Sequence, residues 1–239
     1  MIKQLIKAKE WRFITDKDNS LLTSFNRVFA KEIGQSDAQH FLCQTDKTKT
    51  RKQANEEFKQ AKIELYDWGA KMGYETRSLR DLAFYQLQEK FQTHTFHKKI
   101  YVGGKSHLEY ADNPIEHPLA TIDRGFRLVD CTTNLSSLEP SQVASLILNV
   151  NDNTTNAFIQ QIRRGLSFLE RPLVTARGDG KSYIYSNFNP KYAQVALTIL
   201  RTYYNFCLPF KTKGRKETPA QRLGIANRKY ELQDIIYMQ

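Results

Sequence analysis

The sequence predicts an α/β fold in which a mixed sheet is flanked by helices, and three segments near the N-terminus carry this prediction. Residues 11–15 (WRFIT) alternate bulky and polar side chains, as a short strand does. Apolar residues then follow at helical spacing over 21–33, with Gly34 as the stop signal. Residues 38–45 (AQHFLCQT) fit a second strand. A strand, loop and helix therefore open the fold.

The rest of the chain divides into a central and a C-terminal part. The Lys-rich segment after residue 45 predicts a long amphipathic helix ending near Gly73, and a further helix is expected over about residues 78–92. Helical periodicity is then lost, and Gly and Pro pairs separate the strand-like pieces KIYV and FRLVD. We interpret 36–135 as a mostly helical insertion. Helicity returns at about 139–149, 154–170 and 189–207, so that 136–239 is predicted to be largely helical.

The charge distribution favours a polyanionic partner. The 239 residues include 36 Lys+Arg and 25 Asp+Glu, a net charge of +11. From Arg163 to the end, 14 Lys/Arg and 5 Asp/Glu account for +9 of that total. Such clustering is typical of proteins that bind nucleic acid. The three cysteines are far apart and form no CxxC pair, and no apolar run is long enough for a membrane helix or a signal peptide. We expect a cytoplasmic protein with no membrane partner.

Asp16 is the first candidate metal ligand, because it stands where the predicted strand 11–15 ends. A carboxylate at such a position suits Mg²⁺, which prefers oxygen ligands. The alternative interpretation is that Asp16, Asp18 and Asn19 serve as turn formers and helix N-caps.

Glu170 is the second candidate, at the border of the apolar stripe of the helix predicted over 154–170. Cations surround it in sequence and suit phosphate contacts: Arg163, Arg164, Arg171, Arg177 and Lys181. The tail cations Lys211, Lys213, Arg215 and Lys216 suit nonspecific contacts to a nucleic-acid backbone. The alternatives are a last-turn Glu paired with Arg171, and solvated surface charges.

Other chemistries are disfavoured by the motifs. The string from Gly178 to Ser182 lacks the glycine that a phosphate-binding P-loop requires, since Thr175 occupies that position. His94, His97, His107 and His117 include one HxxH spacing but have no nearby cysteine ligand, which disfavours zinc. A nucleophile motif such as GxSxG does not occur.

Three stretches resemble the cut-and-paste transposases of insertion sequences and the related integrase cores. The ending ILRTYYNFCLPFKTKGRKETPAQRLGIANRKYELQDIIY resembles their "YNF, then TPA, then a glycine-bearing turn" pattern. The stretch 155–194 resembles their helix with the last catalytic acid, and WRFITDKDNSLLTSFNRVFAKEI resembles their strand with the middle acid.

This resemblance implies a partial RNase H-like core. Residues 1–35 would carry the middle acid, 36–135 would be the insertion, and 136–239 would hold the last acid and the basic tail. Asp16 matches the middle Asp of the DDE triad, with Asp18 as a fallback, and Glu170 matches the terminal Glu. The first Asp has no counterpart in the 15 residues before Asp16, so we expect a truncated or split protein that is inactive alone.

The resemblance also implies the function and its partners. A completed site would use Mg²⁺ or Mn²⁺ to nick DNA and transfer the strand, with element ends and target DNA as double-stranded partners. The missing half would come from an upstream polypeptide, or the chain would act as a homodimer. Alternatives are a non-catalytic DNA-binding protein, such as a transposition inhibitor or a domesticated remnant, and a nuclease in which Asp130 replaces the missing acid.

Overall fold

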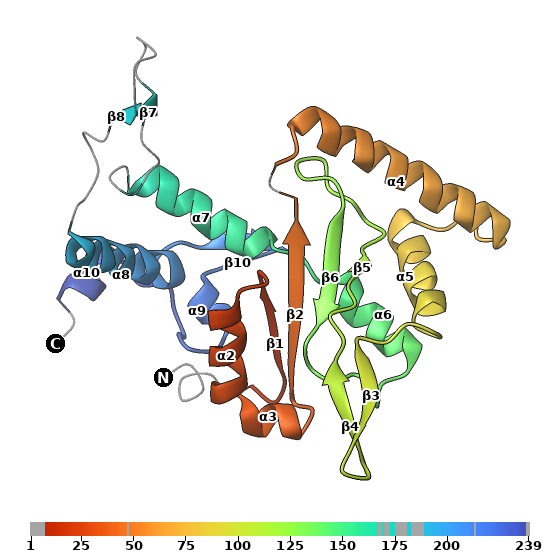
Figure 1. Cartoon of the computed structure of the whole chain (residues 1–239). Helices are drawn as coiled ribbons and strands as arrows, with labels where there is room; N and C mark the ends of the chain where they lie inside the picture. The colour runs from red at the N-terminus through yellow and green to blue at the C-terminus, as the bar shows by residue number, and fades with distance from the viewer. Residues whose placement is uncertain are drawn as a thin grey trace. The chain divides into compact units, whose positions relative to one another are not determined.

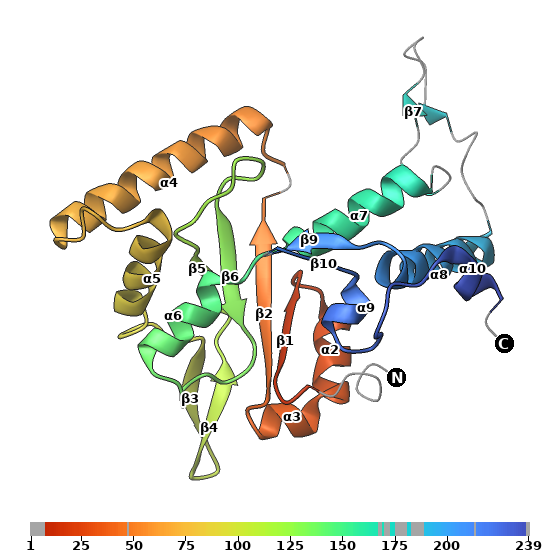
Figure 2. The same ribbon diagram turned by 180° about the vertical axis from the view of Figure 1, so that it is seen from behind.

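A computed structural model describes residues 8–46, 48–166, 169, 173–174, 181–182, 189–212 and 214–237. The chain forms two compact units, Lys9–Asp152 and Asn153–Gln239, the latter together with Met1–Ala8. Figures 1 and 2 show the elements from opposite sides. No helix in the described part of the chain is both long and apolar enough to cross a membrane.

A four-stranded mixed sheet is the centre of the first unit. Its strands follow the order β1 (Trp11–Thr15), β2 (Ala38–Thr45), β6 (Arg127–Cys131) and β5 (Ile115–Glu116). The β1–β2 pair is parallel and the other two pairs are antiparallel. Strands β2, β5 and β6 come from the region 36–135, so this region contributes strands to the same sheet as β1.

Helices α2 (Asn19–Val28) and α3 (Ala30–Gly34) connect β1 to β2 and cover one face of the sheet. Phe25 and Phe29 are buried there against Trp11 and Phe13 of β1, with the rings of Phe13 and Phe29 centred 4.6 Å apart. The alternation of WRFIT causes this packing, because every second side chain of a strand points to the same face.

The opposite face carries the larger core under α4 (Arg51–Lys71), α5 (Leu79–Lys90) and α6 (Pro140–Leu148). Phe41 of β2 and Val129 of β6 are buried in this core with Leu65, Leu82 and Ile147 of the three helices. Each helix begins at a sequence signal: Thr50 forms a capping box for α4, Ser78 caps α5, and a proline opens α6.

A hairpin of β3 (His97–Val102) and β4 (Lys105–Tyr110) completes the first unit. Its two strands pair only with each other, and in Figures 1 and 2 the hairpin extends beyond the end of the sheet.

The second unit is built from α7 (Asn153–Gly165) and α8 (Pro190–Phe206), with two short hairpins and two terminal helices. The remaining elements are β7 (Leu173–Val174), β8 (Lys181–Ser182), β9 (Phe210–Thr212), β10 (Arg215–Glu217), α9 (Pro219–Arg222) and α10 (Leu232–Ile236). The rings of Phe158 of α7 and Tyr204 of α8 are in contact, with their centroids 4.9 Å apart.

The structure confirms the α/β class with a mixed sheet and flanking helices. It also confirms the first two strands and the helices expected near 78–92, 139–149 and 189–207. The strand-like piece KIYV lies in β3, and the predicted breakers Gly103 and Gly104 both have positive φ and form the two-residue turn to β4, a strand that was not predicted.

Candidate functional site

Asp16 lies where β1 ends, and its side chain is exposed. Its backbone carbonyl accepts hydrogen bonds from the amide of Asp18, at 2.9 Å, and from the hydroxyl of Thr15, at 3.0 Å. Asp18 is the N-cap of α2, because its carboxylate accepts hydrogen bonds from the backbone amides of Ser20 and Leu21. The interpretation of Asp18 as an N-cap is therefore confirmed.

A buried histidine supports the backbone at Asp16. His40 of β2 is fully buried, and its Nε2 lies 2.8 Å from the hydroxyl of Thr15 while its Nδ1 lies 2.9 Å from that of Thr132. Burial lowers the pKa of His40 to about 4, so the imidazole is neutral near pH 7. A neutral ring donates one hydrogen bond and accepts one. This matches a relay in which Thr132 donates to His40, His40 to Thr15, and Thr15 to the Asp16 carbonyl.

A second polar chain joins the residue after Asp16 to the sheet. Lys17 Nζ lies 2.5 Å from Asp112 Oδ1, and the Tyr110 hydroxyl donates to Asp130 Oδ2 at 2.7 Å. Asp130 is buried on β6 and also accepts the amide of Cys131 at 2.7 Å. Burial raises the pKa of Asp130, whereas the hydrogen bond from Lys17 lowers that of Asp112.

The carboxylates near Asp16 do not fit a Mg²⁺ site as they stand. Asp18 caps a helix, Asp112 pairs with Lys17, and Asp130 is buried with both oxygens accepting hydrogen bonds. The nuclease hypothesis that gave Asp130 the role of the missing acid therefore has no support in its environment. Among the residues the structure describes, no three His, Cys, Asp or Glu side chains are grouped so as to hold a metal ion.

The predicted site residues of the second unit are only partly within the described residues. Arg163 and Arg164 lie in the last turn of α7 with exposed side chains. Lys181 begins β8. Glu170, Arg171 and Arg177 lie outside the described residues, as does Lys213 of the tail.

The basic tail forms an antiparallel ribbon of β9 and β10. Lys211 of β9 stands directly opposite Lys216 of β10, and both are exposed. Arg215 pairs with Thr212 at the next position and is exposed as well. The ribbon is joined to α9 by Arg222, whose guanidinium donates to the carbonyl of Phe210 at 2.5 Å. Three predicted tail cations are thus brought onto one short ribbon.

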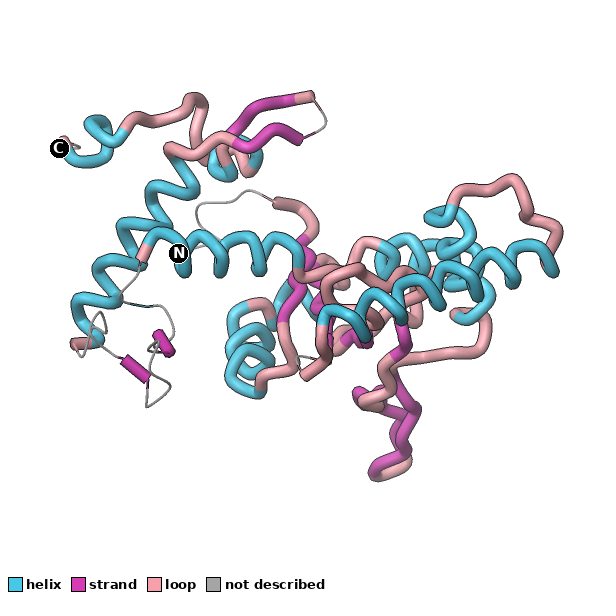
Figure 3. Tube along the Cα trace, turned by 90° about the horizontal axis from the view of Figure 1, so that it is seen from above, coloured by secondary structure: helices cyan, strands magenta, loops and turns pink. Residues whose placement is uncertain are grey.

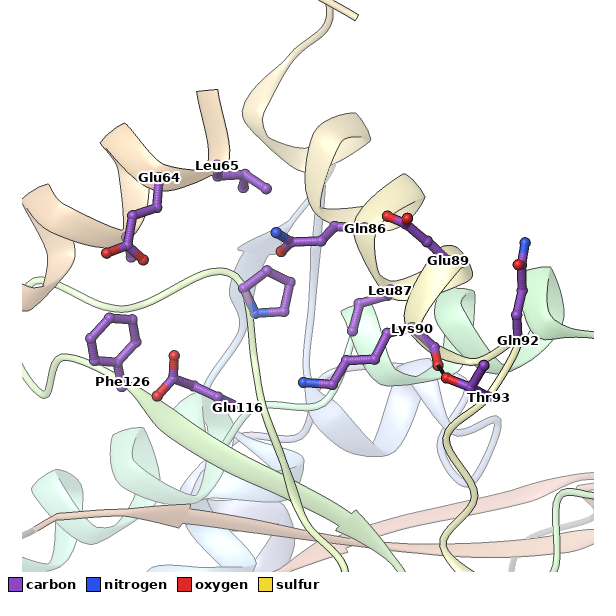
Figure 4. A pocket seen from close by; sticks show the side chains of 12 residues that line it. Glu64, Leu65, Gln86, Leu87, Glu89, Lys90, Gln92, Thr93, Glu116 and Phe126 are labelled. Carbon is purple, nitrogen blue, oxygen red and sulfur yellow. Dashed lines mark hydrogen bonds between the residues drawn. The ribbon is translucent and has the colours of Figure 1, made fainter. Parts of the chain in front are cut away.

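A cavity of about 560 Å³ lies between α4, α5 and β5 (Figure 4). The carboxylates of Glu64 and Glu116 turn into the same space as the amino group of Lys90. Burial raises the pKa of Glu116, and Lys90 opposes that shift. A mixed lining of this kind disfavours phosphate, because the two carboxylates repel an anion.

Two features of these sites were missed by reasoning from the sequence. His40 stands among apolar residues in AQHFLCQT, and a polar residue inside an apolar strand was the available signal. The like-charged pair Lys211 and Lys216 depends on strand register, which the spacing around Gly214 alone does not fix.

Comparisons of this chain with protein-family models, with curated proteins and with solved structures find no match.

Proposed function

We propose that this chain binds double-stranded DNA as part of a DDE-type transposase, holding the DNA without breaking it by itself. The observation that carries the proposal is the pair of exposed lysines that face each other on β9 and β10. Like charges directly opposite on a ribbon are destabilising. A polyanion removes the repulsion, because phosphates placed along the ribbon neutralise both ammonium groups.

Further charges support a DNA partner over a small anion. Arg215 extends the cationic surface of the ribbon, and Arg163 and Arg164 add exposed charge to α7 in the same unit. A small anion needs a closed pocket, whereas a DNA backbone is contacted by separate exposed cations. The net charge of +9 from Arg163 onward, from 14 Lys/Arg and 5 Asp/Glu, supports the same choice.

The transposase part of the proposal rests on Asp16 and on the resemblance. An exposed carboxylate at the end of a parallel strand, followed at once by a helix, is where the resemblance puts the middle acid of an RNase H-like core. Glu170 would be the last acid. The first acid and the strand that carries it would come from a segment outside the printed sequence. Mg²⁺ or Mn²⁺ would bind only to that completed site.

DNA binding is tested first, by fluorescence anisotropy with a labelled duplex at several salt concentrations. K211A/K216A is expected to weaken binding about tenfold and to reduce the slope of log affinity against log salt by about 2, one unit for each lost phosphate contact. K52A/K59A is the matched control, since it removes two exposed lysines of α4. Equal affinity of K211A/K216A and the parent chain would overturn the proposal.

Catalysis is tested separately, with a nicking and strand-transfer assay on the DNA that flanks the gene. The chain is assayed alone and with the polypeptide encoded upstream, in Mg²⁺ or Mn²⁺, and D16N is compared in both. Activity only in the mixture, lost in D16N, would support a split transposase. Tight binding without nicking in any mixture would favour the alternative, a transposition inhibitor or domesticated remnant.

A further inference from the structure

The hairpin β3–β4 is a second exposed ribbon with a composition suited to nucleic acid. Each strand has six residues and all six cross-strand pairs form, from His97 with Tyr110 to Val102 with Lys105. The turn residues Gly103 and Gly104 both have positive φ, +58° and +76°, as a tight two-residue hairpin turn requires. Figure 3 shows the strand pair and its turn as a narrow projection.

The tip of this hairpin exposes large apolar side chains. Tyr101 is 78% exposed and Val102 is 60% exposed, and Leu108 is also exposed. Such side chains normally lie in a core, and a free-standing hairpin is marginally stable in water. Their exposure on a projecting ribbon indicates a contact surface.

The charge of the hairpin is positive. Its cations are Lys98, Lys99 and Lys105, and its one carboxylate, Glu109, lies opposite Lys98 with an Nζ–Oε2 distance of 3.1 Å. Lys99 and Lys105 therefore stand exposed beside the apolar tip. A purely apolar partner would leave these ammonium groups without partners, whereas phosphates on both sides of a groove would receive them.

The base of the hairpin is held firmly by the first unit. Tyr110 donates to the buried Asp130, His97 Nε2 lies 3.3 Å from the carbonyl of Thr132, and the amide of Ala111 donates to the carbonyl of Phe96 at 3.0 Å. A ribbon that is held at its base loses little entropy on binding, which favours docking as a rigid body.

The dimensions fit one groove of duplex DNA. Two strands of six residues make a ribbon about 20 Å long. The major groove, about 12 Å wide and 8.5 Å deep, admits a two-stranded ribbon, while the minor groove, about 6 Å wide, is too narrow. We infer that the β3–β4 hairpin enters the major groove of duplex DNA, with Tyr101 and Leu108, which share one face of the ribbon, against base edges and with Lys99 and Lys105 on the flanking phosphates.

This inference rests on the proposed function, because it requires that the chain binds duplex DNA. The test uses the full chain, a labelled 25-bp duplex and anisotropy across a salt series. K99A/K105A is expected to bind about tenfold more weakly with a salt slope smaller by about 2, and Y101A several-fold more weakly with an unchanged slope. K52A/K59A again serves as the charge-matched control.

Dimethyl sulfate reports the groove, because it methylates guanine N7 in the major groove. The parent chain should protect N7, and Y101A should lose that protection. Duplex binding and N7 protection unchanged in the hairpin variants, with K211A/K216A still weakened, would overturn the inference and leave the proposed function standing. If the hairpin variants lose binding to anionic vesicles while their duplex binding stays unchanged, the inference is also overturned. A parent chain that binds no duplex would overturn both.

Discussion

The two lysine-bearing hairpins, β3–β4 and β9–β10, differ in the residue that a lysine faces on the opposite strand. In β3–β4 one lysine faces a glutamate, and the strands are long and tied to a buried core. In β9–β10 the strands have three residues each, and Lys211 faces Lys216. In the first hairpin a carboxylate offsets part of the charge, whereas in the second the proposed DNA partner would offset it. We therefore expect a substitution or a change of pH to affect the stability and the DNA affinity of one hairpin independently of the other.

The largest difference is expected in acid, because the unit that anchors β3–β4 contains two buried neutral histidines. Burial lowers the pKa of His40 to about 4 and that of His117 to about 3, against 6.5 for a free imidazole. A depressed pKa stabilises the fold above pH 6.5, and this stabilisation is lost as pH falls toward the folded pKa. Each histidine should cost about 3 kcal/mol of unfolding free energy at pH 4.

Hydrogen exchange read by mass spectrometry at pH 7 and pH 4.5, corrected for the intrinsic rates, checks this difference. Amides of β2, β6 and β3–β4 should lose protection in acid, while those of β9–β10 should change little. Replacing the exposed His107 with Gln is the control and should leave the acid transition in place. Equal loss of amide protection in β3–β4 and β9–β10 would contradict the prediction that acid destabilises only the first of these hairpins.

The second largest difference is expected for the side-chain hydrogen bonds that attach each hairpin to the rest of its unit. Y110F removes the hydroxyl that donates to the buried Asp130, and leaving that carboxylate without this donor should cost about 1–3 kcal/mol. The loss should grow as pH rises, since the pKa of Asp130 is already raised by burial and its charged form then keeps only the Cys131 amide as donor. R222A removes a more exposed hydrogen bond to Phe210 and should cost less than about 1 kcal/mol. Urea unfolding at pH 5 and pH 8 compares the two variants.

Exchanging the charge pattern of β9–β10 for that of β3–β4 is the third test. K216E places a carboxylate opposite Lys211, and an opposite-charge pair should stabilise the ribbon by about 0.2–1 kcal/mol. The same change should weaken DNA binding by about tenfold, because a phosphate contact becomes a repulsion. Urea unfolding and duplex anisotropy measured on one preparation check both signs. A variant that is less stable would show that the lysines do not repel each other.

Local patterns predicted the parts of the fold that are local. The alternation in WRFIT, the caps of the helices and the stripe of α8 are set by residues a few positions apart, and the predicted elements are in place. The strand FRLVD was predicted, but its pairing with β2 joins residues about 90 apart, such as Leu42 and Asp130. Spacing within a segment carries no information on such pairs.

The candidate site was predictable to the same extent. Asp16 was located from the end of a strand, which is a local signal. The relay through His40 and Thr132 and the contact of Tyr110 with Asp130 depend on which strands become neighbours. Gly103 and Gly104 were predicted only as breakers, and the hairpin was missed because the strand that follows them, β4, was not predicted.

The smallest effect is expected from the glutamate of β3–β4. E109Q removes the carboxylate opposite Lys98 and frees that ammonium group for a phosphate. Both side chains are more than half exposed, so the ion pair contributes little, and unfolding free energy should change by less than about 0.5 kcal/mol. Duplex affinity should rise about two- to threefold, with a salt slope larger by up to about 1. Anisotropy at 50 and 200 mM salt resolves this change, with E56Q on exposed α4 as the charge-matched control. If E56Q raises the affinity equally, net charge alone accounts for the gain, and β3–β4 has no closer contact with DNA than the rest of the surface.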